Sequence, residues 1–185
     1  MRIIGGTRRG LRLADVGEGD AAAHLRPTSD RVREAIFNLL INAHGNPVTG
    51  ARVLDLFAGT GALGLEALSR GAAEAVFVDD GSKAVALMRA NIARMKAEGE
   101  TRILRQDAAR LGPNSGAPFT LVFLDPPYGK AMGEAALTVA LQGGWIAPEA
   151  VIVWEEGSAP TLPEGFTLLD QRRYGDTFVT LLSPV

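Results

Sequence analysis

The sequence predicts an α/β fold in which helices cover both faces of a mostly parallel, seven-stranded sheet that ends in an antiparallel hairpin. Three observations support this fold class. Short apolar runs, typical of buried strands, alternate with longer segments whose apolar residues recur at helical spacing. A glycine-rich turn joins the first of these strands to the helix that follows it. The last two apolar runs flank a short turn that contains glycine, as in a β-hairpin.

The expected helices and strands follow in a regular order along the chain. The first helix runs from residue 30 to about residue 43, because Thr28 or Ser29 can cap it and Gly45-Asn46-Pro47 ends it. Buried strands are expected over residues 52–57, 75–78, 102–104, 119–124 and 151–154. Helices are expected over residues 63–70, 82–98 and 133–141, and a hairpin pairs residues 166–169 with 177–182. Alternating strands and helices imply right-handed crossovers.

Two regions are expected. Residues 1–46 form a basic arm and a helix that cover the substrate or the cofactor, and residues 47–185 form the ligand-binding domain. The arm is basic because residues 1–12 carry arginines and no acid. The net charge of −2 argues against bulk attraction to nucleic acid, but it is compatible with such a local basic patch.

Composition excludes several classes of function. The chain has no cysteine, which excludes disulfides and thiolate chemistry, and its only histidines are His24 and His44. A His-rich metal site is therefore excluded, and we predict no metal. The N-terminus lacks the apolar run of a signal peptide, and no apolar stretch is long enough to span a bilayer. We therefore expect a cytoplasmic protein with no membrane partner.

The turn after the first strand has the pattern of a nucleotide-binding loop. Gly59, Gly61 and Gly64 fit G-x-G-x-x-G between a strand and a helix. Glycines allow a ligand to approach the backbone closely, and the helix N-terminus offers unpaired N–H groups. Asp79 ends the next strand, where a carboxylate can accept hydrogen bonds from both hydroxyls of a ribose. This pattern alone is equally typical of nicotinamide dinucleotide binding.

Two further acids favour a different cofactor. Asp55 lies in the first strand, where it would repel a pyrophosphate but attract a cationic ligand. Asp107 follows the third strand, where it could accept a hydrogen bond from an adenine amino group or could merely cap a short turn. Together with Asp79, these acids lie at the carboxyl ends of successive strands. A ribose, an adenine and a sulfonium would suit that edge, and S-adenosylmethionine contains all three.

The sequence Asp125-Pro126-Pro127-Tyr128 ends the fourth strand at the same edge. The exocyclic amine of a nucleobase is a poor nucleophile, because its lone pair is delocalised into the ring. The Asp125 carboxylate and the Pro126 carbonyl could accept its two N–H groups and orient the lone pair toward a methyl donor. The ring of Tyr128 offers a face for an unstacked base. A plain strand-ending turn is the alternative interpretation of these four residues.

Four segments carry a resemblance to a known family: residues 1–6, residues 26–28 with 30–35, residues 54–67 and residues 125–128. In this order they resemble the bacterial methyltransferases that modify N2 of a guanine in 16S ribosomal RNA. The resemblance covers nearly the whole chain and implies the Rossmann-like fold of class I methyltransferases. It also implies S-adenosylmethionine as methyl donor, S-adenosylhomocysteine as product, and 16S ribosomal RNA or a small-subunit assembly particle as partner. We expect a monomer.

The resemblance also assigns the site residues. Catalytic residues that hold the target base are expected to be Asp125, Pro126 and Tyr128. Cofactor-binding residues are expected to be Asp55, Phe57, Gly59, Thr60, Gly61, Asp79, Asp80, Asp107 and Ala108, with Thr28 and Arg31 closing over the cofactor or the substrate. Residues that contact RNA phosphates are expected to be Arg2, Arg8, Arg9, Arg12 and Arg26.

The sequence departs from the family in one position. Where the family usually has an acid two residues after the ribose acid, this chain has Gly81. Either Asp79 or Asp80 could therefore bind the ribose, and strand register favours Asp79. The loop over residues 14–24 is also longer than in the family.

Three other functions remain as alternatives. The Asp-Pro-Pro-Tyr motif would also suit methylation of adenine N6 or cytosine N4 in DNA or RNA, although the chain has no room for a target-recognition domain beside the sheet. A nicotinamide oxidoreductase is disfavoured by Asp55 and by the prolines of the motif. A non-catalytic RNA-binding module is disfavoured by the intact motif.

Overall fold

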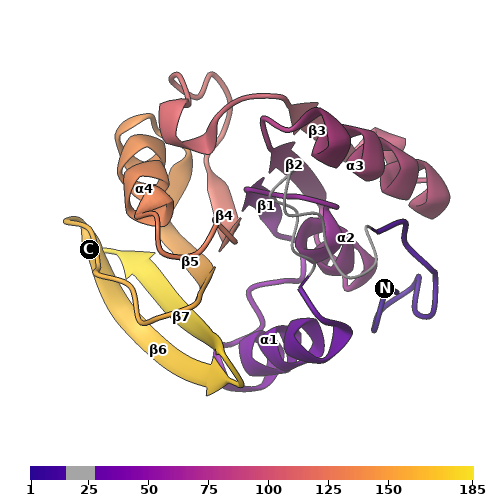
Figure 1. Cartoon of the computed structure of the whole chain (residues 1–185), viewed down its shortest axis with the longest axis horizontal. Helices are drawn as coiled ribbons and strands as arrows, with labels where there is room; N and C mark the ends of the chain where they lie inside the picture. Colours follow the sequence, from indigo (N-terminus) through magenta and orange to yellow (C-terminus); the bar gives the residue numbers. More distant parts are fainter. Residues whose placement is uncertain (16–27) are drawn as a thin grey trace.

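Seven strands form one mixed sheet in the order β3-β2-β1-β4-β5-β7-β6 (Figure 1). The computed structural model describes residues 1–15 and 28–185. Strands β1 to β5 run parallel, whereas β7 pairs antiparallel with both β5 and β6. The predicted mostly parallel sheet with a C-terminal hairpin is therefore confirmed. The strand order reverses between β1 and β4, at the point where open α/β sheets bind ligands.

The helices and strands have the following bounds. The strands are β1 (Arg52–Leu56), β2 (Glu74–Val78), β3 (Thr101–Leu104), β4 (Phe119–Leu124), β5 (Ile146–Glu156), β6 (Phe166–Tyr174) and β7 (Thr177–Pro184). The α-helices are α1 (Asp30–Ala43), α2 (Ala62–Ser69), α3 (Ser82–Met95) and α4 (Met132–Gln142). Two short 3-10 turns are η1 (Glu98–Glu100) and η2 (Ala108–Arg110).

Three elements have a boundary that differs from the expected one by three residues or more. α3 ends at Met95, earlier than expected, because Lys96 adopts a left-handed conformation with φ of 55°. β5 begins at Ile146, since the chain bulges past two exposed residues before its register with β4 resumes. β6 continues through the polar residues 170–173 to Tyr174, because an exposed edge strand pairs through its backbone and needs no apolar pattern.

Two hydrophobic clusters cover the two faces of the sheet, as parallel strands require. On one face, α1, α2 and α3 pack against residues such as Val53 and Phe123. On the other face, α4 packs against residues such as Leu54 and Trp154. All residues of α2 are buried, so the helix that follows the glycine turn is enclosed on every side.

The N-terminal arm, residues 1–15, is bound to this core. Its two halves pair through an isolated antiparallel bridge. Ile3 and Leu13 are buried in the same cluster as α1, α2 and α3. Glu66 in the middle of α2 accepts hydrogen bonds from the backbone N–H groups of Ile4 and Gly5, both at 2.9 Å. The arm is thus a packed part of the fold.

The expected regions 1–46 and 47–185 do not have separate cores, because their described residues contribute to one hydrophobic cluster. The role of the first region as a cover stays a prediction. Within residues 1–15 and 28–185, no helix is both long and apolar enough to cross a membrane. The same residues contain no group of three or more histidines, cysteines or acids placed to hold a metal ion.

Candidate functional site

A cavity of about 550 Å³ lies at the carboxyl ends of the parallel strands, where β1 and β4 are neighbours. Among the described residues that line it, Lys130 is the only cation. The acids that line it are Asp55, Asp79, Asp80, Asp107, Asp125, Glu155 and Asp176. This excess of acids favours a ligand that carries positive charge or many hydrogen-bond donors.

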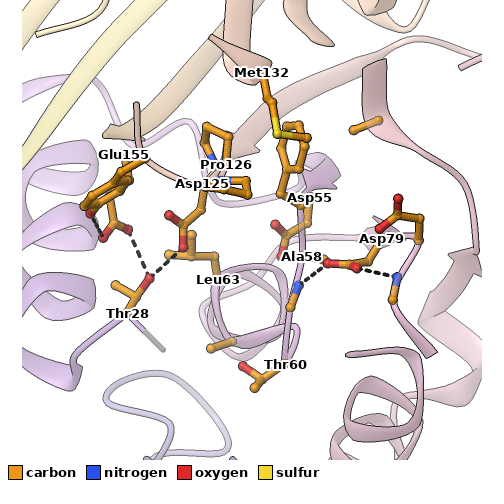
Figure 2. A pocket seen from close by; sticks show the side chains of 18 of the residues that line it. Thr28, Asp55, Ala58, Thr60, Leu63, Asp79, Asp125, Pro126, Met132 and Glu155 are labelled. Carbon is orange, nitrogen blue, oxygen red and sulfur yellow. Dashed lines mark hydrogen bonds between the residues drawn. The ribbon is translucent and has the colours of Figure 1, made fainter. Parts of the chain in front are cut away.

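The glycine turn holds Asp79 in a fixed orientation (Figure 2). Its carboxylate accepts one hydrogen bond from the N–H of Gly59 and one from the N–H of Gly81, both at 2.9 Å. Burial raises the pKa of Asp79, and these two hydrogen bonds oppose the rise. Asp80 also lines the cavity but is exposed. The orientation of Asp79 agrees with its predicted role, and its binding to ribose stays a prediction.

Asp55 lies deep in the cavity and is 1% exposed. It accepts a hydrogen bond from the N–H of Gly64 at 3.0 Å. Burial is the main cause that raises the pKa of Asp55 to about 8, and the charge of Asp79 contributes. A cation bound nearby would favour the ionised carboxylate.

Gly64 has a packing role. A Cβ added to it would lie 2.4 Å from the ring of Phe77 and 3.1 Å from Asp55. The third glycine of the motif therefore allows α2 to pack closely against the sheet, and it is not among the residues that line the cavity.

The other predicted cofactor residues are divided between the cavity and its surroundings. Phe57, Gly59, Thr60, Thr28 and Ala108 line the cavity, and their binding to the cofactor stays a prediction. Asp107 lines it and also caps η2, because its carboxylate accepts a hydrogen bond from the N–H of Ala109 at 2.9 Å. Both interpretations of Asp107 are thus compatible with the structure.

Two predicted cofactor residues do not line the cavity. Gly61 caps α2 with φ of 80°, and a Cβ there would lie 3.3 Å from the side chain of Met88. Gly61 thus contributes to the conformation of the turn, and other residues of the turn line the cavity. Arg31 is exposed on α1 and lies outside the lining residues. The structure therefore does not bring Arg31 to the cavity.

The motif residues Asp125 and Pro126 line the cavity together with Thr28 and Glu155 (Figure 2). Tyr128 of the motif also lines it. The hydroxyl oxygen of Thr28 lies 3.1 Å from Asp125 Oδ2 and 3.0 Å from Glu155 Oε2. Burial is the main cause that raises the pKa of Asp125 well above its usual range, and the charge of Glu155 is the second cause. The fourth strand therefore ends in a carboxylate that faces the cavity beside a second acid.

Both the hydroxyl and the ring of Tyr128 have close contacts. Its hydroxyl lies 3.4 Å from Glu155 Oε1 and 3.3 Å from the hydroxyl of Thr177. Its ring lies against the backbone of Gly157, where an added Cβ would be 2.6 Å from the ring. A glycine at this position thus makes room for the tyrosine.

Sequence reasoning missed Glu155, which is 5% exposed and lines the cavity. The signal was present in the sequence, because Glu155 ends the apolar run of β5 as Asp125 ends that of β4. The two strands are parallel neighbours in which Leu124 pairs with Trp154. The next residue on each strand is an acid, and both acids reach the same cavity.

Four of the predicted RNA-contacting arginines, all in the arm, do not line the cavity. Arg2, Arg9 and Arg12 are exposed, and none of them lines the cavity. Arg8 is half-buried and forms an ion pair with Glu100 at 3.3 Å. Arg26 lies outside the described residues.

The strand order, the glycine turn and the acid-lined cavity define a protein with the class I methyltransferase fold. Within that class, the family model described as "Conserved hypothetical protein 95" matches residues 1–183, and the chain belongs to this family.

Individual relatives agree with this placement. "Ribosomal RNA small subunit methyltransferase D" of Escherichia coli (strain K12) is 39% identical over 171 residues, which cover 91% of this chain and 82% of that protein. The solved structure of yhhF from Escherichia coli has a TM-score of 0.83 and 36% identity, and the match covers 100% of this chain and 97% of that one. The structure of SMU.776, solved in complex with SAH, shares the fold with a TM-score of 0.59 at 17% identity over 82% of this chain and 49% of that one.

Proposed function

We propose that the chain transfers a methyl group from S-adenosylmethionine to the exocyclic N2 of a guanine in 16S ribosomal RNA. The observation that carries this proposal is the position of Asp125, which directly follows β4 and lines the same cavity as the glycine turn and Asp79. The name of the Escherichia coli relative supports ribosomal RNA of the small subunit as the substrate.

The residues around the glycine turn would hold the cofactor, which supplies an electrophilic methyl group on a sulfonium. Asp79 is oriented to accept hydrogen bonds from ribose hydroxyls, since backbone N–H groups fix both of its oxygens. Asp107 lies where it could accept from an adenine amino group, and Asp55 would favour the positive charge of the sulfonium. The SAH in the SMU.776 structure supports this choice of ligand.

The residues at the end of β4 would position the target amine. The Asp125 carboxylate accepts a hydrogen bond from one N–H of the guanine N2 group, and the Pro126 carbonyl accepts a hydrogen bond from the other. The N2 lone pair is thereby directed at the methyl carbon, and it forms the new N–C bond while the electron pair of the S–C bond stays on sulfur. N2 then releases one proton, which the Asp125 carboxylate or water takes up.

A methyl-transfer assay with labelled S-adenosylmethionine tests this proposal. The substrates are 16S ribosomal RNA, small-subunit particles and duplex DNA, and mass spectrometry identifies the methylated nucleoside. N2-methylguanosine from RNA or particles is the expected product. N6-methyladenine or N4-methylcytosine would contradict the proposed substrate, and a protein that binds reduced nicotinamide in place of S-adenosylmethionine would contradict the chemistry.

The variant Asp125→Ala tests the division of roles within the cavity. It should lose methyl transfer by at least about a hundredfold and keep its affinity for the cofactor, because Asp125 serves the base. A loss of cofactor affinity with transfer otherwise intact would contradict that role. The affinity is measured by calorimetric titration with S-adenosylhomocysteine.

A further inference from the structure

Two acids face the same cavity from neighbouring strands. Since Leu124 of β4 pairs with Trp154 of β5, Asp125 and Glu155 follow at equivalent positions (Figure 2). Glu155 is 5% exposed, and both carboxylates lie within hydrogen-bonding distance of the Thr28 hydroxyl. The base-binding part of the cavity thus contains two carboxyl groups that share one short hydroxyl side chain.

This arrangement favours a ligand with two adjacent hydrogen-bond donors. The hydroxyl of Thr28 has one proton and can donate to only one of the two carboxylates at a time, and the hydroxyl of Tyr128, 3.4 Å from Glu155 Oε1, is a second donor beside Glu155. Two carboxylates at such close range repel each other unless donors or a proton lie between them. A carboxylate can accept several hydrogen bonds, so a ligand edge with neighbouring N–H groups would add one further donor to each acid.

Nucleobases differ in that edge. Guanine presents the N1–H donor beside the N2 amino group, so both neighbouring positions donate. Adenine presents the N1 acceptor beside its N6 amino group, and cytosine presents the N3 acceptor beside its N4 amino group. An ionised carboxylate opposite either of those ring nitrogens would face a lone pair, with repulsion and no hydrogen bond.

We propose that Glu155 is a specificity-determining residue that accepts the N1–H of the target guanine while Asp125 accepts an N–H of N2. This proposal rests on the proposed function. Glu155 touches the substrate at the atom that distinguishes guanine from the other amino-bearing bases. It also stabilises the positive charge that develops over N2, C2 and N1 as the N–C bond forms.

The discriminating substrate is 2-aminopurine, which keeps the amino group at C2 but has an acceptor at N1. Once the modified nucleotide is identified, a synthetic RNA fragment carries either guanosine or 2-aminopurine there, within an assembled particle if the particle is the substrate. The measured quantity is the ratio of kcat/KM for guanosine to kcat/KM for 2-aminopurine.

The variant Glu155→Gln should lower this ratio about tenfold to a hundredfold, because the amide can donate to the N1 acceptor of 2-aminopurine. Glu155→Asp keeps a carboxylate and should keep the preference for guanosine even at a lower rate. Glu156→Gln is the matched control. Glu156 is equally buried but accepts from the N–H groups of Gly129 and Gly157, so its ratio should not change.

The outcomes separate the two proposals. If the wild-type protein methylates no guanine, the proposed function fails and Glu155 has no role in reading guanine. If the wild-type protein makes N2-methylguanosine and Glu155→Gln keeps the wild-type ratio, Glu155 only supports Thr28 and Tyr128, and the specificity proposal is overturned. If the Glu155→Gln protein does not fold, Glu155→Asp becomes the deciding variant. A loss of its preference for guanosine over 2-aminopurine would then overturn the proposal.

Discussion

Glu66 lies at the centre of the contacts that bind the N-terminal arm to the core, and its replacement by glutamine should destabilise the whole protein. Its carboxylate is fully buried and accepts from the backbone N–H groups of Ile4 and Gly5. It also forms ion pairs with Arg33 at 3.2 Å and Arg70 at 2.9 Å. Glutamine has nearly the same size but no charge, and its NH₂ group would face these donors.

The expected loss follows from the burial of the partner. Arg33 is fully buried and would keep only its ion pair with the partly exposed Asp30. Removing one partner of a buried ion pair costs about 3 to 5 kcal/mol. For a chain of this size, that loss corresponds to a fall in Tm of about 6 to 20 °C.

Urea unfolding followed by circular dichroism and tryptophan fluorescence measures the free energy of unfolding of Glu66→Gln. Glu74→Gln is the control, because the partly exposed ion pair of Glu74 with Arg52 should contribute less than about 1 kcal/mol. Trypsin should also cleave after the arm arginines faster in Glu66→Gln than in the control. A loss below about 1 kcal/mol for Glu66→Gln would refute the idea that this carboxylate binds the arm to the core.

Three further predictions concern the cavity and the arm. In the folded protein the pKa of Asp55 is about 8, against 3.8 in the unfolded chain, so the folded state keeps a proton that the unfolded state loses. The free energy of unfolding should therefore fall by about 1.4 kcal/mol per pH unit between pH 5 and 7, relative to that of Asp55→Asn. A difference between the two proteins that stays constant with pH would mean that the buried carboxyl is already ionised. Calorimetric titration should show a loss of S-adenosylmethionine affinity of about tenfold or more in Asp79→Ala but a smaller loss in Asp80→Ala, and the reverse order would assign the ribose to Asp80. Replacing Arg8 and Arg9 by alanine should weaken RNA binding and reduce the slope of the logarithm of the binding constant against the logarithm of the salt concentration by about 1 to 2. An unchanged slope would mean that these two arginines do not contact RNA phosphates.

The sequence predicted the parts of the site that depend on local pattern. The glycine turn, Asp79 and Asp125 directly follow apolar strands, and Asp55 lies near the end of one. Parallel strands place their carboxyl ends at one edge of the sheet. Glu155 follows the same rule but was missed, because its importance depends on the pairing register of two strands that are distant in sequence.

The binding of the arm to the core was also hard to predict. The four arginines in residues 1–12 resemble a solvated or RNA-binding tail, and the structure shows that Ile3 and Leu13 of the arm pack into the core. Contact of these arginines with RNA stays a prediction. A signal exists in the sequence of α2, where Glu66 stands between apolar residues on all sides of the helix. A charged residue in a helix that is apolar all round indicates a buried charge that needs partners.

The contact of Thr28 with both cavity acids has a consequence for synthesis of the protein. Thr28 lies 97 residues before Asp125 and 127 residues before Glu155 along the chain. A nascent chain that has left the ribosome up to the end of α3 can have formed the arm, α1 and the glycine turn, but it lacks both carboxylates that face Thr28. The part of the cavity that we propose binds the base can therefore form only after β5 has emerged, and shorter translation products lack one or both of these acids.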